Sequence, residues 1–218
     1  MKWHEEAVPS GCRETADRLK SFPPLGEFYL AGGTAVALYY GHRISVDLDF
    51  FSGSNSLDFS RRQELISGLN KLGIEIAEEK EGTLHARHGQ THLSLFRYSY
   101  PTLRPLRRWN SIQVAHPIDI ALMKVGAIIG RGSRKDFIDL YLILQNEISI
   151  EKLLRLSKKK FKGVRDLVFQ ACKALVYFQD AETEPPLRML ATISWKAVKD
   201  FFETEVRKLA GGSGRASS

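Results

Sequence analysis

The chain has 218 residues, of which 43% are hydrophobic and 26% charged, as is ordinary for a globular protein. No run of about 18 apolar residues is present, and the first residues lack the apolar core of a signal peptide, which excludes a membrane-spanning or secreted protein by these criteria. We therefore expect a cytoplasmic protein with one large or two small domains. The spacing of Cys12 and Cys172 predicts reduced thiols.

The formal net charge is +7, and the excess is concentrated in one segment. Between Lys152 and Lys173 the chain has eight basic residues and one acidic residue. A clustered basic patch attracts polyanions more strongly than a scattered excess. Segment 152–173 is therefore a candidate RNA-binding surface. Basic runs such as Lys158–Lys160 are also typical of a solvated helix face.

The first half of the chain is predicted to mix helices and strands. A helix capped by Ser10 is expected to reach Phe22, where Pro23 and Pro24 end it. Gly89–Gln90 is expected to join two strands as a hairpin. The remaining predictions are strands over 27–31, 43–51, 74–79, 83–88, 91–98 and 111–115, and helices over 32–42 and 57–72.

The second half is predicted to be helical, so the expected fold class is α+β with a boundary near residue 116. Periodicity indicates helices over 117–129, 135–144, 150–156, 163–178 and 193–209. The expected organisation is an α/β domain over 1–115, a helical domain over 116–210 that completes the site, and a flexible tail over 211–218.

The residues from Arg43 to Phe50 alternate strictly between polar and apolar. The polar positions are Arg43, Ser45, Asp47 and Asp49, and the apolar positions are Ile44, Val46, Leu48 and Phe50. A period of two is typical of a β-strand with one face in the core. The other face would then carry two carboxylates.

Asp47 and Asp49 are about 7 Å apart along such a strand. Paired carboxylates repel each other unless a cation or a donor neutralises them. Mg²⁺ or Mn²⁺, completed by the oxygens of a nucleoside triphosphate, would do so. The alternative is an acidic turn or an exposed strand end.

Gly32 and Gly33 stand at the predicted strand-to-helix junction. Without Cβ atoms they allow the backbone to approach a phosphate, and a helix N-terminus favours an anion. Thr34 could add a hydroxyl donor, and Ser45 could bind a phosphate or a metal-bound water. Arg43 could bind phosphate or pair with an aspartate. A tight turn is the alternative explanation for the two glycines.

Lys124 is expected on a helix with apolar residues three and four positions away on both sides. Either the ammonium extends past them to water, or it points into a site where a triphosphate compensates its burial. Asp136 and Asp139 lie one turn apart on the next helix. They could hold Lys124 or Arg134 by charge pairing, or be surface charges.

Four segments in order resemble the motifs of the AbiEii/AbiGii family of nucleotidyltransferase-like toxins, which have the DNA polymerase β-type nucleotidyltransferase fold. The resemblance spans about residues 28 to 144. The matching residues are Gly32-Gly33-Thr34-Ala35 with Leu38, then Gly41-His42-Arg43-x-Ser45-x-Asp47-Leu48-Asp49-Phe50-Phe51, then Lys124 with Ala127, then Arg134-Lys135-Asp136-Phe137-x-Asp139-Leu140.

The resemblance implies a toxin of a bacterial toxin–antitoxin or phage-defence pair. Such a protein would transfer a nucleotide from a triphosphate to an RNA, with tRNA as the expected acceptor, and could have a cognate antitoxin. Asp47 and Asp49 would carry the metal and Lys124 would bind the triphosphate. Gly33 and Ser45 would hold phosphates, while Asp136 or Asp139 would support the site.

The chain departs from the family pattern in two places. Polymerase β-type enzymes usually have a third carboxylate on a later strand, where this chain has no acid between Thr91 and Phe96. The third motif often has an acid before its lysine, where this chain has Met123. These departures leave open a weakly active or inactive nucleotide- or RNA-binding module. A nucleotide-sugar glycosyltransferase with an Asp-x-Asp motif is a further alternative.

Overall fold

The computed structural model describes residues 2–212. The chain divides between His116 and Pro117 into two compact units. The first unit contains a mixed sheet with flanking helices and the second unit is helical. The fold class is therefore α+β, as the sequence predicts.

The described part of the first unit forms a seven-stranded sheet in the order β3-β4-β5-β2-β1-β7-β6. The sheet is mixed, because β2 pairs in parallel with β5 and β1 in parallel with β7, while the other pairs are antiparallel. The strands are β1 (Tyr29–Leu30), β2 (Asp47–Ser52), β3 (Glu75–Lys80), β4 (Thr83–His88), β5 (Thr91–Arg97), β6 (Arg107–Trp109) and β7 (Ile112–Val114).

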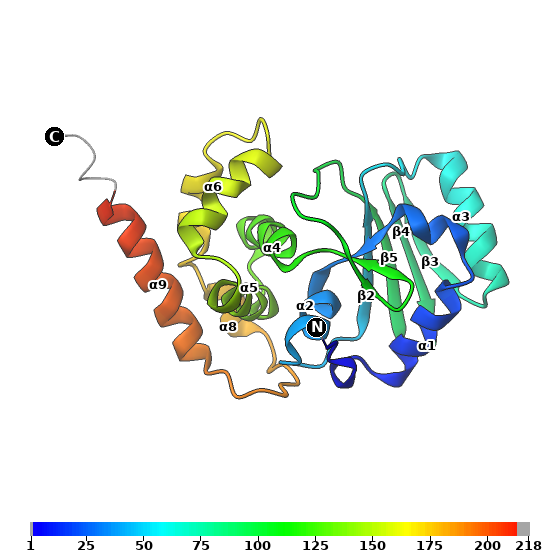
Figure 1. Ribbon diagram of the computed structural model, residues 1–218, viewed down its shortest axis with the longest axis horizontal. Coiled ribbons are helices and arrows are strands. Elements are labelled where there is room, and N and C mark those ends of the chain that lie inside the picture. The colour runs from blue at the N-terminus through cyan, green and yellow to red at the C-terminus, as the bar shows by residue number, and fades with distance from the viewer. Residues whose placement is uncertain (1, 213–218) are drawn as a thin grey trace. The chain divides into compact units, whose positions relative to one another are not determined.

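Three α-helices accompany the sheet in the described part of this unit: α1 (Ser10–Leu19), α2 (Gly32–Tyr40) and α3 (Phe59–Lys71). Figure 1 shows α1 and α3 on one side of β3, β4 and β5. On that side the Thr15 hydroxyl of α1 lies 2.9 Å from Nδ1 of His88 in β4. Because side chains alternate along a strand, Leu84 and Ala86 of β4 face the same way as His88, and both are buried.

The predicted strand over 43–51 is too long at its start, since β2 begins at Asp47. Alternation holds from there to Ser52, but Arg43 and Ser45 are buried while Val46 is 43% exposed. The segment before β2 bonds elsewhere: Ser45 N donates to Ala7 O at 3.0 Å. The Cys12 thiol donates to Val46 O at 3.0 Å. These contacts bind the segment to α1 and the turn before it, outside the sheet.

Two further expectations for this unit are wrong: α1 ends at Leu19, short of the expected Phe22, and Ser10 is not its cap. Pro9 occupies the N-cap position and makes no side-chain capping bond. Strand β6 is absent from the sequence-based prediction, since three residues are too short for a periodic signal. The hairpin at Gly89–Gln90 is present, and His88 pairs with Thr91.

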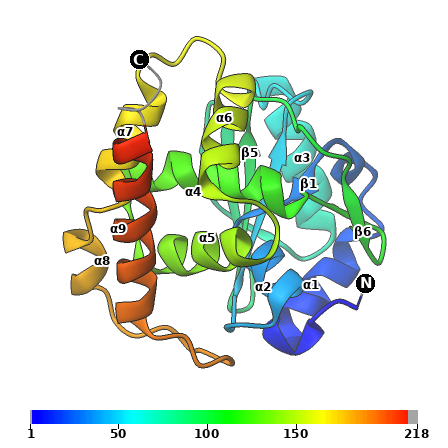
Figure 2. The same ribbon diagram turned by 60° about the vertical axis from the view of Figure 1, so that its left-hand side comes forward.

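In the second unit, α4 packs against α5, α6 and α7, and α5 packs against α8 and α9 (Figure 2). An aromatic cluster fills the space beside α5: the Phe137 ring lies 5.1 Å from Phe178 and 5.6 Å from Phe202 between centroids. The helices are α4 (Pro117–Arg131), α5 (Arg134–Asn146), α6 (Ile150–Lys160), α7 (Leu167–Ala174), α8 (Gln179–Thr183) and α9 (Trp195–Gly212).

The predicted helix over 163–178 is wrong at both ends. Its start is prevented by Gly163 and Asp166, which adopt positive φ angles of 87° and 53°. Helix α6 reaches Lys160, further than the predicted 156. Residues 211 and 212 of the predicted tail belong to α9, and 213–218 lie outside the described residues.

No helix in the part of the chain that the structure describes is long and apolar enough to cross a membrane.

Candidate functional site

Asp47 and Asp49 lie on the same face of β2, because side chains alternate along a strand. Both aspartates are half-buried, whereas Leu48 and Phe50 are buried. Leu48 and Phe50 point the other way into the core, where neither is exposed to solvent. The apolar residues thus anchor the strand while the carboxylates stand on the opposite face. This arrangement is what the sequence predicts for residues 47–50.

The backbone of Gly32 lies directly against Asp49. A Cβ atom on Gly32 would stand 2.7 Å from Oδ2 of Asp49, and the φ angle of this glycine is +65°. Ala31 N also donates to the backbone oxygen of Asp49 at 2.9 Å. A side chain at position 32 would therefore be strained and would displace the carboxylate. The glycine is required both for the turn into α2 and for the close approach.

Gly33 is held just as closely by the segment before β2. A Cβ atom on Gly33 would overlap the Arg43 guanidinium and stand 3.2 Å from the Ser45 hydroxyl oxygen. The structure thus brings the first turn of α2 together with Arg43 and Ser45. Both side chains are more than nine-tenths buried, and the Arg43 guanidinium donates to Ile44 O at 3.3 Å.

Thr34 is buried, and its hydroxyl is committed to bonds within the protein. It donates to Oγ of Ser45 at 2.9 Å and contacts the backbone oxygen of Asp47. The hydroxyl therefore ties α2 to the start of β2 and orients Ser45. We place Thr34 behind the site, although the sequence suggested it as a direct phosphate donor.

The neighbouring strand β5 brings Ser94 beside Asp49 and His92 beside Asp47 in the parallel register. The Ser94 hydroxyl lies 3.1 Å from Nδ1 of His85, the residue of the adjacent strand β4 that pairs with Ser94. A serine bonded to a histidine thus occupies the place on the next strand where a third carboxylate would stand. Within residues 2–212, no group of three or more His, Cys, Asp or Glu side chains is arranged to hold a metal ion.

Two carboxylates and a cradle of glycine backbone fit a hydrated divalent cation. Mg²⁺ is commonly held by one or two carboxylates, with waters and substrate phosphates as its other ligands. Asp47 and Asp49 supply hard oxygen donors of that kind. The missing Cβ of Gly32 lets the Asp49 carboxylate lie directly against the N-terminus of α2, and a helix N-terminus suits a phosphate. The residues present are therefore compatible with a metal-bound triphosphate.

Lys124 is buried in the second unit, so its ammonium does not extend to water. Its Nζ donates to Oδ1 of Asp136 at 2.7 Å and pairs with Oδ2 of Asp139 at 2.8 Å. The side chains of Lys124 and Asp136 are 7% and 12% exposed, and that of Asp139 is not exposed. Of the alternatives drawn from the sequence, charge pairing of both aspartates with Lys124 is the one observed.

Burial lowers the pKa of the Lys124 ammonium, but attraction to Asp139 and Asp136 outweighs this effect. Its pKa therefore lies above the usual value. Ser133, which the sequence patterns did not single out, completes the cluster because its hydroxyl donates to Oδ2 of Asp136 at 2.7 Å. A serine three residues before an aspartate at a helix start is the signal that could have identified it.

Arg134 does not pair with the two aspartates. Its guanidinium donates to Ala181 O at 3.0 Å and lies over the Trp195 ring, 5.3 Å from the centroid. Its backbone N–H donates to Glu184 at 2.9 Å. Arg134 therefore connects the start of α5 to the segment around α8.

The basic segment 152–173 keeps most of its positive charge at the surface. Lys160 is the exception, because it is buried and donates to Asp119 at 2.9 Å with neither side chain exposed. Burial lowers the pKa of Lys160, and Asp119 offsets this only in part. The exposed cations are Lys152, Arg155, Lys158, Lys159, Lys162, Arg165 and Lys173.

The chain matches the family model described as "Nucleotidyl transferase AbiEii toxin, Type IV TA system" over residues 18–210. It therefore belongs to this family of nucleotidyltransferase toxins. A curated relative, "Uncharacterized protein aq_aa25" of Aquifex aeolicus (strain VF5), is 34% identical over 205 residues, which cover 90% of this chain and 94% of the relative.

Two solved structures share the fold at low sequence identity. The nucleotidyltransferase toxin MenT4 (Rv2826c) of Mycobacterium tuberculosis H37Rv is 16% identical with a TM-score of 0.55, over 91% of this chain and 86% of that one. JHP933 of Helicobacter pylori is 17% identical with a TM-score of 0.53, over 97% and 94%. The fold is thus that of the polymerase β-like nucleotidyltransferases, as expected, and the chain is a nucleotidyltransferase by family.

Proposed function

We propose that this protein transfers a nucleotide from a nucleoside triphosphate to an RNA hydroxyl, in a reaction that depends on Mg²⁺ or Mn²⁺ held by Asp47 and Asp49. The observation that carries the proposal is the packing of the Gly32 backbone against Asp49. It joins a helix N-terminus suited to phosphate with a carboxylate suited to a cation. The metal would supply charge neutralisation at the reacting phosphate.

The residues of the first unit have separate tasks in this proposal. Asp47 and Asp49 are the metal ligands. Their fixed strand positions would hold the cation where negative charge develops on the triphosphate. Gly32 and Gly33 offer backbone N–H groups to the phosphates. Arg43 and Ser45, packed against Gly33, hold further phosphate oxygens. Thr34 is a positioning residue that fixes Ser45.

In the second unit we assign Lys124 to binding the triphosphate, with Asp136 and Asp139 as its positioning residues. Both carboxylates lie within 2.8 Å of the ammonium. They keep it protonated and fix its direction, which a flexible surface lysine would lack.

The exposed cations of segment 152–173 are proposed to bind the phosphates of the acceptor RNA, with tRNA as the expected acceptor. The family match supports a role as the toxin of a bacterial toxin–antitoxin or phage-defence system, with an antitoxin as its cognate partner. A cytoplasmic location accords with these substrates.

The test is incubation of the full chain with bulk tRNA, Mg²⁺ and each of the four α-labelled triphosphates in turn. We expect label on the tRNA with at least one nucleotide, and no label when Asp49→Asn replaces the wild type. A folded wild type that transfers none of the four, with either Mg²⁺ or Mn²⁺, would contradict the proposal.

A second candidate is a non-catalytic nucleotide- or RNA-binding module of the same fold. The observation favouring it is the place beside Asp49, which is taken by Ser94 and has no carboxylate. It predicts triphosphate binding that is insensitive to Mg²⁺ and unchanged by Asp47→Asn.

A further inference from the structure

Helix α7 has apolar side chains on two opposite faces, and the described residues cover only one of these faces. Leu167 and Ala171, together with Leu175 just beyond the helix, are buried against the rest of the unit. On the outer face Phe169 is 65% exposed, and Val176, in the turn after the helix, is also exposed. The outer face of α7 thus has the composition of a contact surface.

Exposed apolar residues are concentrated in this part of the chain. Of the eight large hydrophobic residues that the structure finds exposed within residues 2–212, four lie between Val164 and Tyr177. Single exposed hydrophobic residues are common on protein surfaces, whereas a contiguous group marks a site of interaction.

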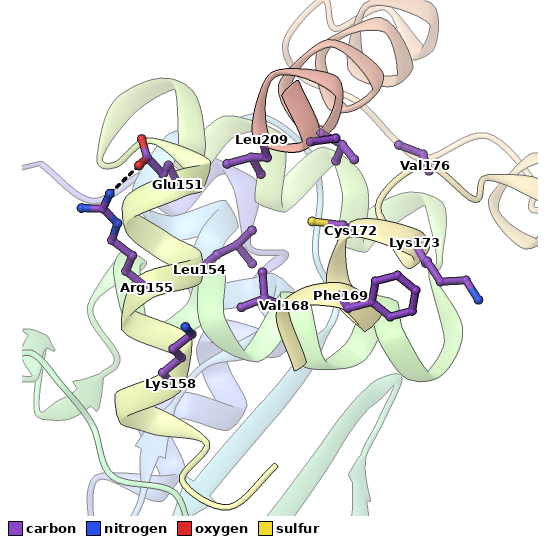
Figure 3. A pocket seen from close by; sticks show the side chains of 12 residues that line it. Glu151, Leu154, Arg155, Lys158, Val168, Phe169, Cys172, Lys173, Val176 and Leu209 are labelled. Carbon is purple, nitrogen blue, oxygen red and sulfur yellow. Dashed lines mark hydrogen bonds and ion pairs between the residues drawn. The ribbon is translucent and has the colours of Figure 1, made fainter. Parts of the chain in front are cut away.

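Two of these four residues, Phe169 and Val176, line a groove between α6, α7 and the end of α9, with a volume of about 510 Å³ (Figure 3). Its sides come from three helices of one compact unit. Aliphatic side chains dominate its lining, including Leu154 of α6, Val168 of α7 and Leu209 of α9. The groove has room for several apolar side chains. Two turns of α6, from Glu151 to Lys158, border it.

The rim of the groove is positively charged. Arg155, Lys158 and Lys173 line it, with Glu151 as the one acidic lining residue. Glu151 is already paired with Arg155 at 2.6 Å. Lys173 lies 5.6 Å from the centre of the Phe169 ring. The ion pairs found among the described residues include none with Lys158 or Lys173, so the rim has positive charge available for an acidic ligand.

We propose that this groove docks an amphipathic helix of a partner protein, with its apolar face in the groove and acidic residues against the rim. Helix-in-groove binding of this kind uses apolar anchors at helical spacing and matching charge at the edges. RNA is a poorer match to the floor of the groove, because bases stack on aromatic surfaces and Phe169 is the one aromatic lining residue. This inference does not rest on the proposed nucleotide transfer. It gives Arg155, Lys158 and Lys173, which that proposal assigns to RNA phosphates, a second ligand that would compete with RNA for them.

The probe is a labelled synthetic helix of about 20 residues, long enough to form in water, with leucine on one face and glutamate elsewhere. Its affinity for the full chain is measured by fluorescence anisotropy. A second peptide with the same leucines and with lysine in place of glutamate is the charge control. We expect the glutamate peptide to bind at least about 10-fold more tightly than the lysine peptide.

The groove itself is tested with Phe169→Asp, at a side chain whose exposure makes the substitution compatible with folding. We expect at least about a 10-fold loss of affinity for the glutamate peptide. Leu190→Asp, at a residue that is 50% exposed and outside the groove, is the matched control and should bind normally. Lys158→Glu should weaken binding, whereas Lys152→Glu on the same helix but outside the lining should have a smaller effect.

A labelled poly(U) oligonucleotide of similar length separates protein from RNA as the ligand. We expect its binding to be indifferent to Phe169→Asp. The inference is overturned if the glutamate peptide fails to bind, if the two peptides bind equally, or if Phe169→Asp and Leu190→Asp have the same effect. It is also overturned if Phe169→Asp abolishes RNA binding and leaves peptide binding intact.

Discussion

Two pairs of aspartates, one in each unit, differ in how the protein treats their charge. Asp47 and Asp49 are half-buried on one face of a strand, against glycine backbone. Asp136 and Asp139 lie one helical turn apart and both contact the buried ammonium of Lys124. We propose the first pair as metal ligands, whereas the second pair is already neutralised in part within the protein.

The two pairs of carboxylates therefore have different consequences for stability and for function. Neighbouring carboxylates on one strand face repel each other, so removing the charge of the half-buried Asp47 should cost the fold little. A buried ion pair that loses one member leaves an uncompensated charge, which is strongly destabilising. The two pairs should therefore respond differently to substitution.

The largest expected effect is on activity, from Asp49→Asn. Because this change removes a proposed metal ligand and keeps the shape of the side chain, nucleotide transfer should fall by at least ~100-fold. The melting temperature should fall by less than in Lys124→Met, because Asp49 is half-buried and Lys124 is buried. Labelled transfer and thermal unfolding are measured together, with Asp17→Asn on the exposed surface of α1 as control. A large drop in melting temperature would remove the contrast between the two pairs.

Lys124→Met should destabilise the protein by about 3 kcal/mol or more, since two carboxylates would remain in a buried position without their cation. Adding Asp136→Asn and Asp139→Asn to the same chain should restore much of that stability. Urea unfolding measures both changes. If the triple variant regains stability and still fails to transfer nucleotide, the cluster of Lys124, Asp136 and Asp139 has a functional role beyond its structural one. Full activity in the stable triple variant would refute that role.

Ser94→Asp would give the first pair a third carboxylate on the adjacent strand. Without metal we expect about 1 kcal/mol of destabilisation, from like-charge repulsion and loss of the bond to His85. Added Mg²⁺ should reverse that loss and should saturate at a lower concentration than for the wild type. Ser94→Ala, which removes the same bond without adding charge, is the matched control. An equal Mg²⁺ response in both variants would contradict a metal site next to Ser94.

The smallest effect concerns pH and compares Lys124 with Lys160. The pKa of Lys124 is raised in the folded state, so its stabilisation is complete below its unfolded value of 10.5 and is lost as the pH rises through the folded pKa. The pKa of Lys160 is lowered, so the folded state releases this proton first and stability rises as the pH approaches 10.5.

We therefore expect the stability difference between wild type and Lys160→Met to change in favour of the wild type as the pH approaches 10.5. The stability difference between wild type and Lys124→Met should stay constant up to pH 10.5 and shrink above that pH. A tenfold difference in proton affinity between the folded and unfolded states corresponds to about 1.4 kcal/mol of stability. Urea unfolding at a series of pH values makes the measurement, and parallel curves for both variants would contradict the assigned directions.

The sequence predicts most of the first unit because its signals are local. Alternation from Asp47 to Phe50 identifies the strand and its two faces without any knowledge of neighbours. The prediction fails at Arg43 to Val46, where long-range bonds to Ala7 and Cys12 override the same alternation. Periodicity describes which faces are apolar, but it does not show which partner a backbone group will bond.

The Lys124 cluster could be predicted in part. The apolar neighbours of Lys124 indicate a special environment, and the choice between Lys124 and Arg134 as the partner of Asp136 and Asp139 depends on how α4 packs against α5. Helix packing angles and side-chain directions are not encoded in spacing along one helix. For the same reason the sequence does not predict the burial of Lys160 in a basic run, because its partner Asp119 is 41 residues away.

The central claim is that the strand with Asp47 and Asp49 holds the metal and the triphosphate. Calorimetric titration of each triphosphate into the full chain, with Mg²⁺ and with EDTA, tests it most directly. We predict binding of at least one triphosphate that requires Mg²⁺ in the wild type and is lost in Asp47→Asn, whose melting temperature is unchanged. Binding of equal strength with EDTA, or in Asp47→Asn, would contradict the account.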